Sequence, residues 1–156
     1  LKDANGKLQS SADFQGQPHI IIFYLGYGCL HCADQLQAFA PKAKDFEEAG
    51  FSMIAISTDG QEDLKVSIDN YDNEGLPIPL VANAELDVFK AFRVFDDFEN
   101  QPLHGTFIVD GNGMVLWQDI SYEPFMDPKF VLKEAKRLLA QTSGPEKKQK
   151  NTDEAN

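Results

Sequence analysis

Residues 20–32, IIIFYLGYGCLHC, decide the fold of this chain. The apolar run at 20–24 is typical of a buried strand, and Gly26 and Gly28 end that strand in a loop. A helical pattern begins directly after Cys32. The two cysteines of the chain therefore form a Cys-x-x-Cys motif between a strand and a helix, which predicts a redox site.

The position of Cys29 favours a reactive thiol. At the N-terminus of a helix, unpaired backbone amides and the helix dipole stabilise the thiolate, which is the nucleophilic form of cysteine. Two buried structural cysteines are the alternative, because free cysteine packs well as a small apolar side chain. A structural zinc site usually has four ligands, and the chain has no second cysteine pair. The spacing and the strand-to-helix junction favour dithiol chemistry.

Hydrophobic periodicity places the other elements on both sides of this motif. The amphipathic pattern after Cys32 continues to residue 49, and Pro41 is expected to kink or divide that helix. A hairpin is expected around residues 110–113, DGNG. The expected strands are 19–25, 51–57, 80–82, 106–109 and 114–118, and the other expected helices are 61–71, 84–92 and 128–140.

This order predicts an α/β fold with a central mixed sheet flanked by helices, parallel in its first half and antiparallel in its last hairpin. We expect one domain over residues 1–142. Residues 143–156 contain a single apolar residue, Ala155, and are expected to be a disordered polar tail.

Composition excludes several classes of partner. A net charge of −11 argues against nucleic acid and anionic membranes, and no apolar run is long enough to span a membrane. Two cysteines are too few for a disulfide scaffold. We expect a soluble monomer that is located in the cytoplasm. The chain opens on Leu1 rather than Met, so we expect it to be a processed or excised fragment.

The element order and the motif resemble the thioredoxin fold. Three stretches are similar, more closely, to the alkyl hydroperoxide reductase and thiol-specific antioxidant group, the peroxiredoxin-like redoxins. These are residues 32–50 (CADQLQAFAPKAKDFEEAG), 54–59 (IAISTD) and 105–113 (GTFIVDGNG). The resemblance covers about residues 1–140 and implies a thioredoxin-like redoxin domain.

The chain departs from the peroxiredoxin pattern around Cys32, which falls on the peroxidatic cysteine of that group. The group has a proline seven residues earlier, a threonine or serine three residues earlier and an arginine before the late strand. Here these positions are Leu25, Cys29 and His104. Gln35 stands where the group often has an acid. The two arginines of the chain, at positions 93 and 137, do not match the arginine of the group.

The chain also departs from thioredoxins proper. The resemblance places Gly28 where thioredoxins have a tryptophan and Leu30 where they have the proline inside the motif. Their buried acid falls at Phe23, and their cis-proline falls at His104. The groups that transfer protons and dock peptides in thioredoxins are therefore absent, although the dithiol is intact.

Two histidines are candidate site residues. His31 precedes the second cysteine, where thioredoxin-fold oxidants often carry histidine, and a cationic imidazole there would stabilise the Cys29 thiolate. His104 is expected across from the dithiol as a proton donor, a metal ligand or a space-filling side chain. His19 is expected to be structural, and the acidic residues 96–99 are expected to form a solvated surface.

The sequence thus predicts a thiol–disulfide oxidoreductase that acts on a protein thiol or disulfide, or on a small disulfide or peroxide. Cys29 would attack, Cys32 would resolve the mixed disulfide, and His31 and His104 would assist. No organic cofactor is implied. One alternative is a peroxidase in which Cys32 attacks peroxide and Cys29 resolves. The other is a Cu(I) or soft-metal protein that binds the metal through Cys29, Cys32 and a histidine.

Overall fold

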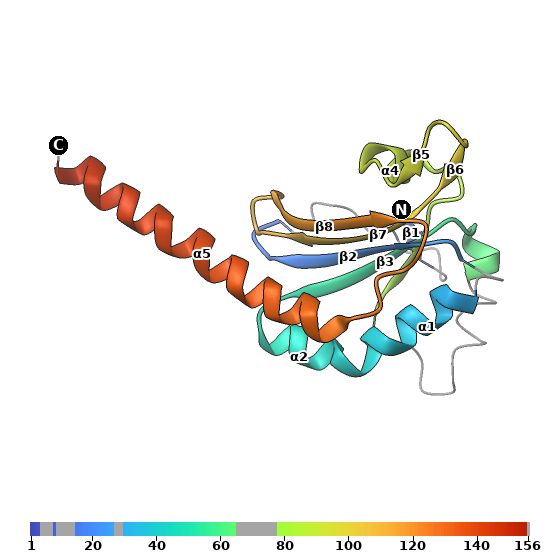
Figure 1. Cartoon of the computed structure of the whole chain (residues 1–156), viewed down its shortest axis with the longest axis horizontal. Coiled ribbons are helices and arrows are strands. Elements are labelled where there is room, and N and C mark those ends of the chain that lie inside the picture. The colour runs from blue at the N-terminus through green and yellow to red at the C-terminus, as the bar shows by residue number, and fades with distance from the viewer. Residues whose placement is uncertain (4–7, 9–14, 27–29, 65–77, 156) are drawn as a thin grey trace.

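The core of the protein is a six-stranded sheet with helices on both faces (Figure 1). The computed structural model describes residues 1–3, 8, 15–26, 30–64 and 78–155. The strands follow one another across the sheet as β1 (Lys2–Asp3), β4 (Leu80–Ala82), β3 (Ser52–Ser57), β2 (His19–Tyr24), β7 (His104–Val109) and β8 (Val115–Ser121).

The directions of the strands confirm the predicted mixed sheet. β3 is parallel to both of its neighbours, β2 and β4. β7 is antiparallel to β2, and β8 is antiparallel to β7. The predicted turn at residues 110–113 joins β7 to β8. Asp110 stabilises this turn, because its carboxylate accepts hydrogen bonds from the amides of Asn112 and Met114, each at 2.9 Å.

Pro41 divides the helix that follows the cysteine motif, as predicted. The chain forms α1 (Leu30–Phe39), then a short 3-10 turn η2 (Ala40–Lys42), then α2 (Ala43–Glu48). Pro41 occupies the first turn of η2, where the amide it lacks has no partner within the helix. Together, α1 and α2 return the chain from the end of β2 to the start of the parallel strand β3.

A small two-stranded sheet was not predicted. It consists of β5 (Phe95–Asp96) and β6 (Gln101–Pro102), and it follows the short helix α4 (Asp87–Ala91), which is shorter than the predicted helix 84–92. Strands of two residues carry too little alternation to be found from hydrophobic pattern. Of the predicted helix 61–71, residues 61–64 are helical and the remainder lies outside the described residues.

The last helix, α5 (Pro128–Ala155), is longer than predicted. We expected a helix at 128–140 and a disordered tail from residue 143, but the structure continues the helix to Ala155. In Figure 1 the second half of α5 projects away from the sheet. Hydrophobic periodicity did not predict the second half of α5, because this segment has almost no apolar residues. Its Glu, Lys and Gln residues nevertheless have high helix propensity. None of the described helices is long and apolar enough to cross a membrane.

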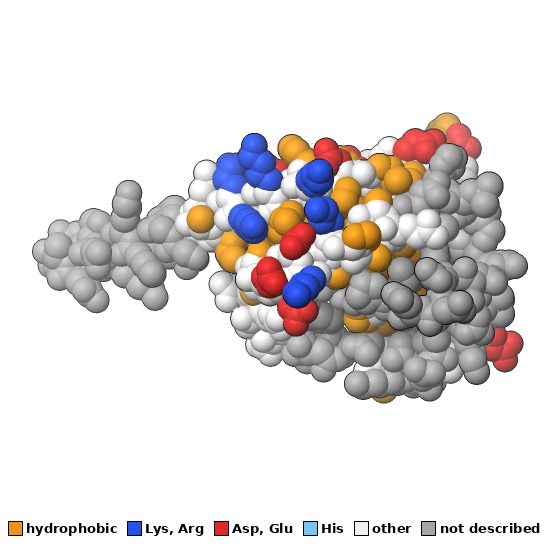
Figure 2. Space-filling view, turned by 90° about the horizontal axis from the view of Figure 1, so that it is seen from below, with side chains coloured by type: hydrophobic (Ala, Val, Ile, Leu, Met, Phe, Trp, Pro, Cys, Tyr) orange, Lys and Arg blue, Asp and Glu red, His pale blue; other side chains and the backbone are white. Residues whose placement is uncertain are grey.

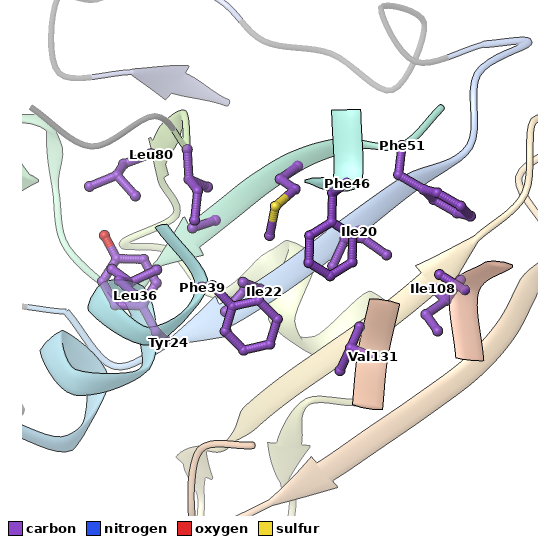
Figure 3. Close-up of a cluster of buried hydrophobic side chains, with 14 of the residues drawn as sticks. Ile20, Ile22, Tyr24, Leu36, Phe39, Phe46, Phe51, Leu80, Ile108 and Val131 are labelled. Carbon is purple, nitrogen blue, oxygen red and sulfur yellow. The ribbon is translucent and has the colours of Figure 1, made fainter. Parts of the chain in front are cut away.

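Both faces of the sheet are buried, so β2 is apolar at nearly every position. Ile20, Ile22 and Tyr24 face α1, α2 and α5, where Leu36, Phe39, Phe46 and Val131 complete one core (Figure 3). Ile21 and Phe23 face the opposite side and pack with Phe89 of α4 and Phe107 of β7. Figure 2 shows that the helical face mixes Lys and Arg with Asp and Glu, so charges of both signs lie on it.

Replacing Phe23 with alanine is expected to lower the free energy of unfolding by about 3–5 kcal/mol. Phe23 is fully buried, and its ring centroid lies 4.9 Å, 5.2 Å and 5.6 Å from those of Phe89, Phe92 and Phe107. Urea denaturation gives the value. Phe98→Ala is the matched control, because Phe98 is 92% exposed and its loss should change stability by less than about 0.5 kcal/mol. Equal losses in the two variants would contradict the described packing.

Candidate active site

The cysteine motif follows the strand β2 and extends into the helix α1, and residues 27–29 lie outside the described residues. β2 ends at Tyr24 and α1 begins at Leu30, so Cys32 and His31 lie in the first turn of α1. Cys29, directly before α1, lies outside the described residues. The structure therefore places the second cysteine of the motif at the N-terminal end of a ten-residue helix, where the helix dipole favours an anion.

The loop that leads to the motif is fixed by the segment after β3. Thr58 donates its hydroxyl to the carbonyl of Leu25 at 2.8 Å and its amide to the carbonyl of Tyr24 at 3.3 Å. Gly26 has a φ of +77°, and a Cβ atom there would lie 2.4–2.6 Å from the carboxylate of Asp59. No other residue fits this position without displacing Asp59, so the direction in which the chain leaves β2 is set by glycine.

His104 lies where the sequence predicted it, at the start of a strand. It is the first residue of β7, and because Gly105 pairs with Phe23, His104 is next to the carboxyl end of β2. His104 is 4% exposed. Side chains alternate along a strand, so His104 shares a face with Thr106 and Ile108, and Ile108 belongs to the core beneath α1. The imidazole is thus on the side of the sheet that α1 covers.

Gln35 of α1 is a polar residue that was not among the site residues predicted from the sequence. Its side chain is fully buried. The Nε2 atom donates to the hydroxyl of Thr106 at 3.3 Å and to the carbonyl of Phe125 at 3.2 Å. The Oε1 atom is buried and has no hydrogen-bond partner among the described residues. Its position three residues after Cys32 was the available signal, since residues three apart share a helix face.

The bond between Gln35 and Thr106 fixes the register of α1 on the sheet. α1 runs antiparallel to β2 and therefore in the same direction as β7. One turn back from Gln35 along α1 is Cys32, and two residues back from Thr106 along β7 is His104. The turn of α1 that carries Cys32 therefore lies over the end of β7 that carries His104.

The two arginines stand elsewhere. Arg93 lies in the turn after α4 with an exposed side chain, and Arg137 lies on α5, where it pairs with Glu134 at 2.6 Å. Neither occupies the position of His104, as the sequence predicted. Among the described His, Lys and Arg side chains, His104 is the one that is buried at this end of the sheet.

The acidic residues at 96, 97 and 99 were expected to be a solvated surface, and two of them, Asp97 and Glu99, are exposed. Asp96 instead has a structural role: its carboxylate accepts hydrogen bonds from the amides of Phe98 and Glu99 and from the hydroxyl of Tyr122. These bonds lower the pKa of Asp96, and the bond to Asp96 raises the pKa of Tyr122. The contact ties the β5–β6 sheet to the segment after β8.

The segment that contains Phe125 is held by aromatic packing. The ring centroids of Trp117 and Phe125 lie 5.2 Å apart, and Phe130 lies 5.9 Å and 5.8 Å from these two. The carbonyl of Phe125 is therefore a fixed acceptor for Gln35 rather than part of a free loop.

His19 is on the far face of the sheet from α1. It opens β2, and its Nδ1 atom lies 3.2 Å from the carbonyl of Gln17. Burial lowers the pKa of His19, while that hydrogen bond and the charge of Asp110 oppose the shift. Side chains alternate along β2, so His19 is on the same face of the sheet as Ile21 and Phe23. It therefore lies on the opposite face from His104.

The sequence profile of the AhpC/TSA family matches residues 1–118 of the chain. The chloroplastic peroxiredoxin Q of Sedum lineare is 30% identical over 140 residues, which cover 89% of this chain and 72% of that protein. The chloroplastic peroxiredoxin Q of Populus jackii is 29% identical over 140 residues, covering 89% of this chain and 63% of the relative.

Solved structures show the same fold. Enterococcus faecalis AhpC superposes with a TM-score of 0.82 at 16% identity, covering 92% of this chain and 87% of that one. Xanthomonas campestris peroxiredoxin Q superposes with a TM-score of 0.77 at 19% identity, covering 88% and 89%. Profile, relatives and fold agree with the sheet described above, and the chain belongs to the AhpC/TSA family of thioredoxin-fold, peroxiredoxin-like oxidoreductases.

Proposed function

We propose that this chain is a thiol-dependent peroxidase in which Cys32 reduces a hydroperoxide and Cys29 then forms a disulfide with it. Sequence alone favoured Cys29 as the attacking thiol of a disulfide oxidoreductase. Membership of a peroxiredoxin family now favours Cys32. The structural observation that carries the proposal is the register of α1 on β7, with the Cys32 turn over the buried His104.

The reaction proceeds in two balanced steps. The Cys32 thiolate attacks the terminal oxygen of a hydroperoxide, the O–O bond breaks, and an S–O bond forms to give a sulfenic acid and an alkoxide, which takes up a proton. The Cys29 thiolate then attacks the Cys32 sulfur, the S–O bond breaks as the S–S bond forms, and the hydroxide that leaves takes up a proton to become water. Two thiols supply the two electrons, so no organic cofactor is needed. A protein dithiol or a small thiol restores the reduced pair.

His104 has the role of proton donor to the departing alkoxide. Charge develops on that oxygen in the transition state, and a preorganised donor in a site that excludes water stabilises it strongly. His104 is 4% exposed and stands at the end of β7 that faces the Cys32 turn. His31, next to Cys32 in the first turn of α1, supports the thiolate when its imidazole is cationic.

Dithiol exchange on a protein substrate is the second candidate. The observation that favours it is the start of α1 at Leu30, because Cys29 then directly precedes a helix N-terminus, the position of an attacking thiol in dithiol exchange. The soft-metal alternative gains no support from the relatives, which are peroxiredoxins. We expect the chain to act as a monomer.

Counting thiols after a single turnover tests the proposal. The reduced protein, freed of reductant, is mixed with one equivalent of hydrogen peroxide under anaerobic conditions. We expect one peroxide consumed and two thiols lost per chain, with the circular dichroism spectrum unchanged. Persistence of both the peroxide and the thiols would contradict the peroxidase. If a disulfide substrate then oxidised both thiols within the same time, dithiol exchange would replace peroxide reduction as the proposed function.

A further inference from the structure

We propose that Gln35 is a substrate-binding residue whose Oε1 atom accepts the O–H of the hydroperoxide at Cys32. The inference rests on the proposed peroxidase and assigns to it the acceptor that orients the substrate. The observation behind it is a buried polar atom that has no described hydrogen-bond partner. The chemical class that fits this atom is a small molecule with one O–H donor on the oxygen to be attacked.

The contacts of Gln35 fix which end of the amide is available. The atom 3.2 Å from the carbonyl of Phe125 must be a donor, because a carbonyl oxygen only accepts. Nε2 therefore lies on that side, where it also donates to Thr106 at 3.3 Å. Both partners are held in place, Thr106 by the strand β7 and Phe125 by its contact with Trp117. Rotation of the amide would break both bonds, so Oε1 is the atom that remains for a ligand.

A buried acceptor without a donor is costly. Leaving such an atom unpaired costs about 1–3 kcal/mol, and the great majority of buried polar atoms in proteins are satisfied. Gln35 is fully buried, and its Oε1 has no hydrogen-bond partner among the described residues. A substrate that brings its own proton donor recovers this cost on binding, which makes the atom a means of recognition.

The proposed contact requires Gln35 and Cys32 to share one face of α1. Cys32 is one helical turn before Gln35, and residues three apart on a helix have Cβ atoms about 5–6 Å apart on the same face. A peroxide in position for attack has its terminal oxygen about 3–3.5 Å from the sulfur. An amide one turn along the helix reaches the hydrogen on that oxygen.

The same hydrogen bond serves the substrate and the product. The hydrogen of a hydroperoxide is on the terminal oxygen, which is the oxygen transferred to sulfur, so it becomes the O–H of the Cys32 sulfenic acid. The alkoxide departs on the other side and takes its proton from His104.

The test compares a reagent that has the O–H with one that lacks it. Cys32 is made the single thiol by Cys29→Ala, since a serine there would add a hydroxyl to the site. Rates of Cys32 oxidation by hydrogen peroxide and of Cys32 alkylation by iodoacetamide are measured in this parent. Gln35→Met is expected to slow the peroxide reaction at least about tenfold, the value of one hydrogen bond, and to change alkylation less than about twofold.

Gln37→Met is the matched control, because Gln37 is an exposed glutamine on the same helix, and both rates should stay at those of the parent. Thr106→Val removes one of the two bonds that orient the amide and should cause a smaller selective loss, which keeps the test valid if Gln35→Met does not fold. Equal peroxide rates in the parent and the folded variants, or equal slowing of both reactions, would overturn the inference alone. A parent that is alkylated but never oxidised by peroxide would overturn the peroxidase and this inference with it.

Discussion

Replacing Cys32 with serine is expected to lower the rate of peroxide reduction at least about a thousandfold, because the thiolate is the nucleophile and a serine hydroxyl does not replace it at neutral pH. The steady-state assay follows loss of hydrogen peroxide in the presence of dithiothreitol. Cys32 lies in the first turn of α1, and serine is nearly the same size as cysteine, so the fold should remain.

Cys29→Ala provides the comparison for this prediction. In the proposed mechanism Cys29 acts only after the O–O bond is broken, so the first equivalent of peroxide should be consumed at a rate within about an order of magnitude of the wild-type value. A Cys32→Ser protein that retains most of its activity, together with an inactive Cys29→Ala protein, would show that the roles of the two cysteines are reversed.

Replacing His104 with glutamine should lower the rate constant for reaction with peroxide about a hundredfold, the usual loss when a donor to a developing oxyanion is removed. His104 is buried at the end of β7, and the two arginines of the chain stand elsewhere, so no other described cation takes its place at that position. Stopped-flow measurement of the first turnover isolates this step from recycling of the disulfide.

His19→Gln is the matched control for His104→Gln. His19 opens β2 on the face of the sheet away from α1, so the same substitution there should leave the peroxide rate unchanged. His104→Lys offers a second comparison, because a cation at this position should restore part of the lost rate. Equal rates in wild type and His104→Gln would remove His104 from the mechanism.

The central part of the fold could be predicted from the sequence because local chemistry determines it. The apolar run at 20–24 is buried on both faces, Pro41 ends the helical run that precedes it, and the turn at residues 110–113 is stabilised by Asp110. The position of His104 was expected instead from the resemblance to thioredoxins, whose cis-proline falls there, and β7 does begin at His104 beside the end of β2.

The polar contacts beneath α1 could not be predicted in the same way. Gln35 reaches Thr106 across 71 residues of sequence and Phe125 across 90, and no periodicity connects positions so far apart. Its role depends on the register of α1 on β7, which tertiary packing sets. The length of α5 was also missed, because a helix that leaves the core shows no apolar stripe.

Trapping the oxidised sulfur shows which cysteine attacks peroxide. Cys29→Ala protein is treated with one equivalent of hydrogen peroxide in the presence of dimedone, which labels sulfenic acids, and is then digested and analysed by mass spectrometry. We expect a dimedone adduct on the peptide that contains Cys32. An unlabelled and still reduced Cys32, with a mixed disulfide accumulating on Cys29 in Cys32→Ser protein given a disulfide substrate, would contradict it.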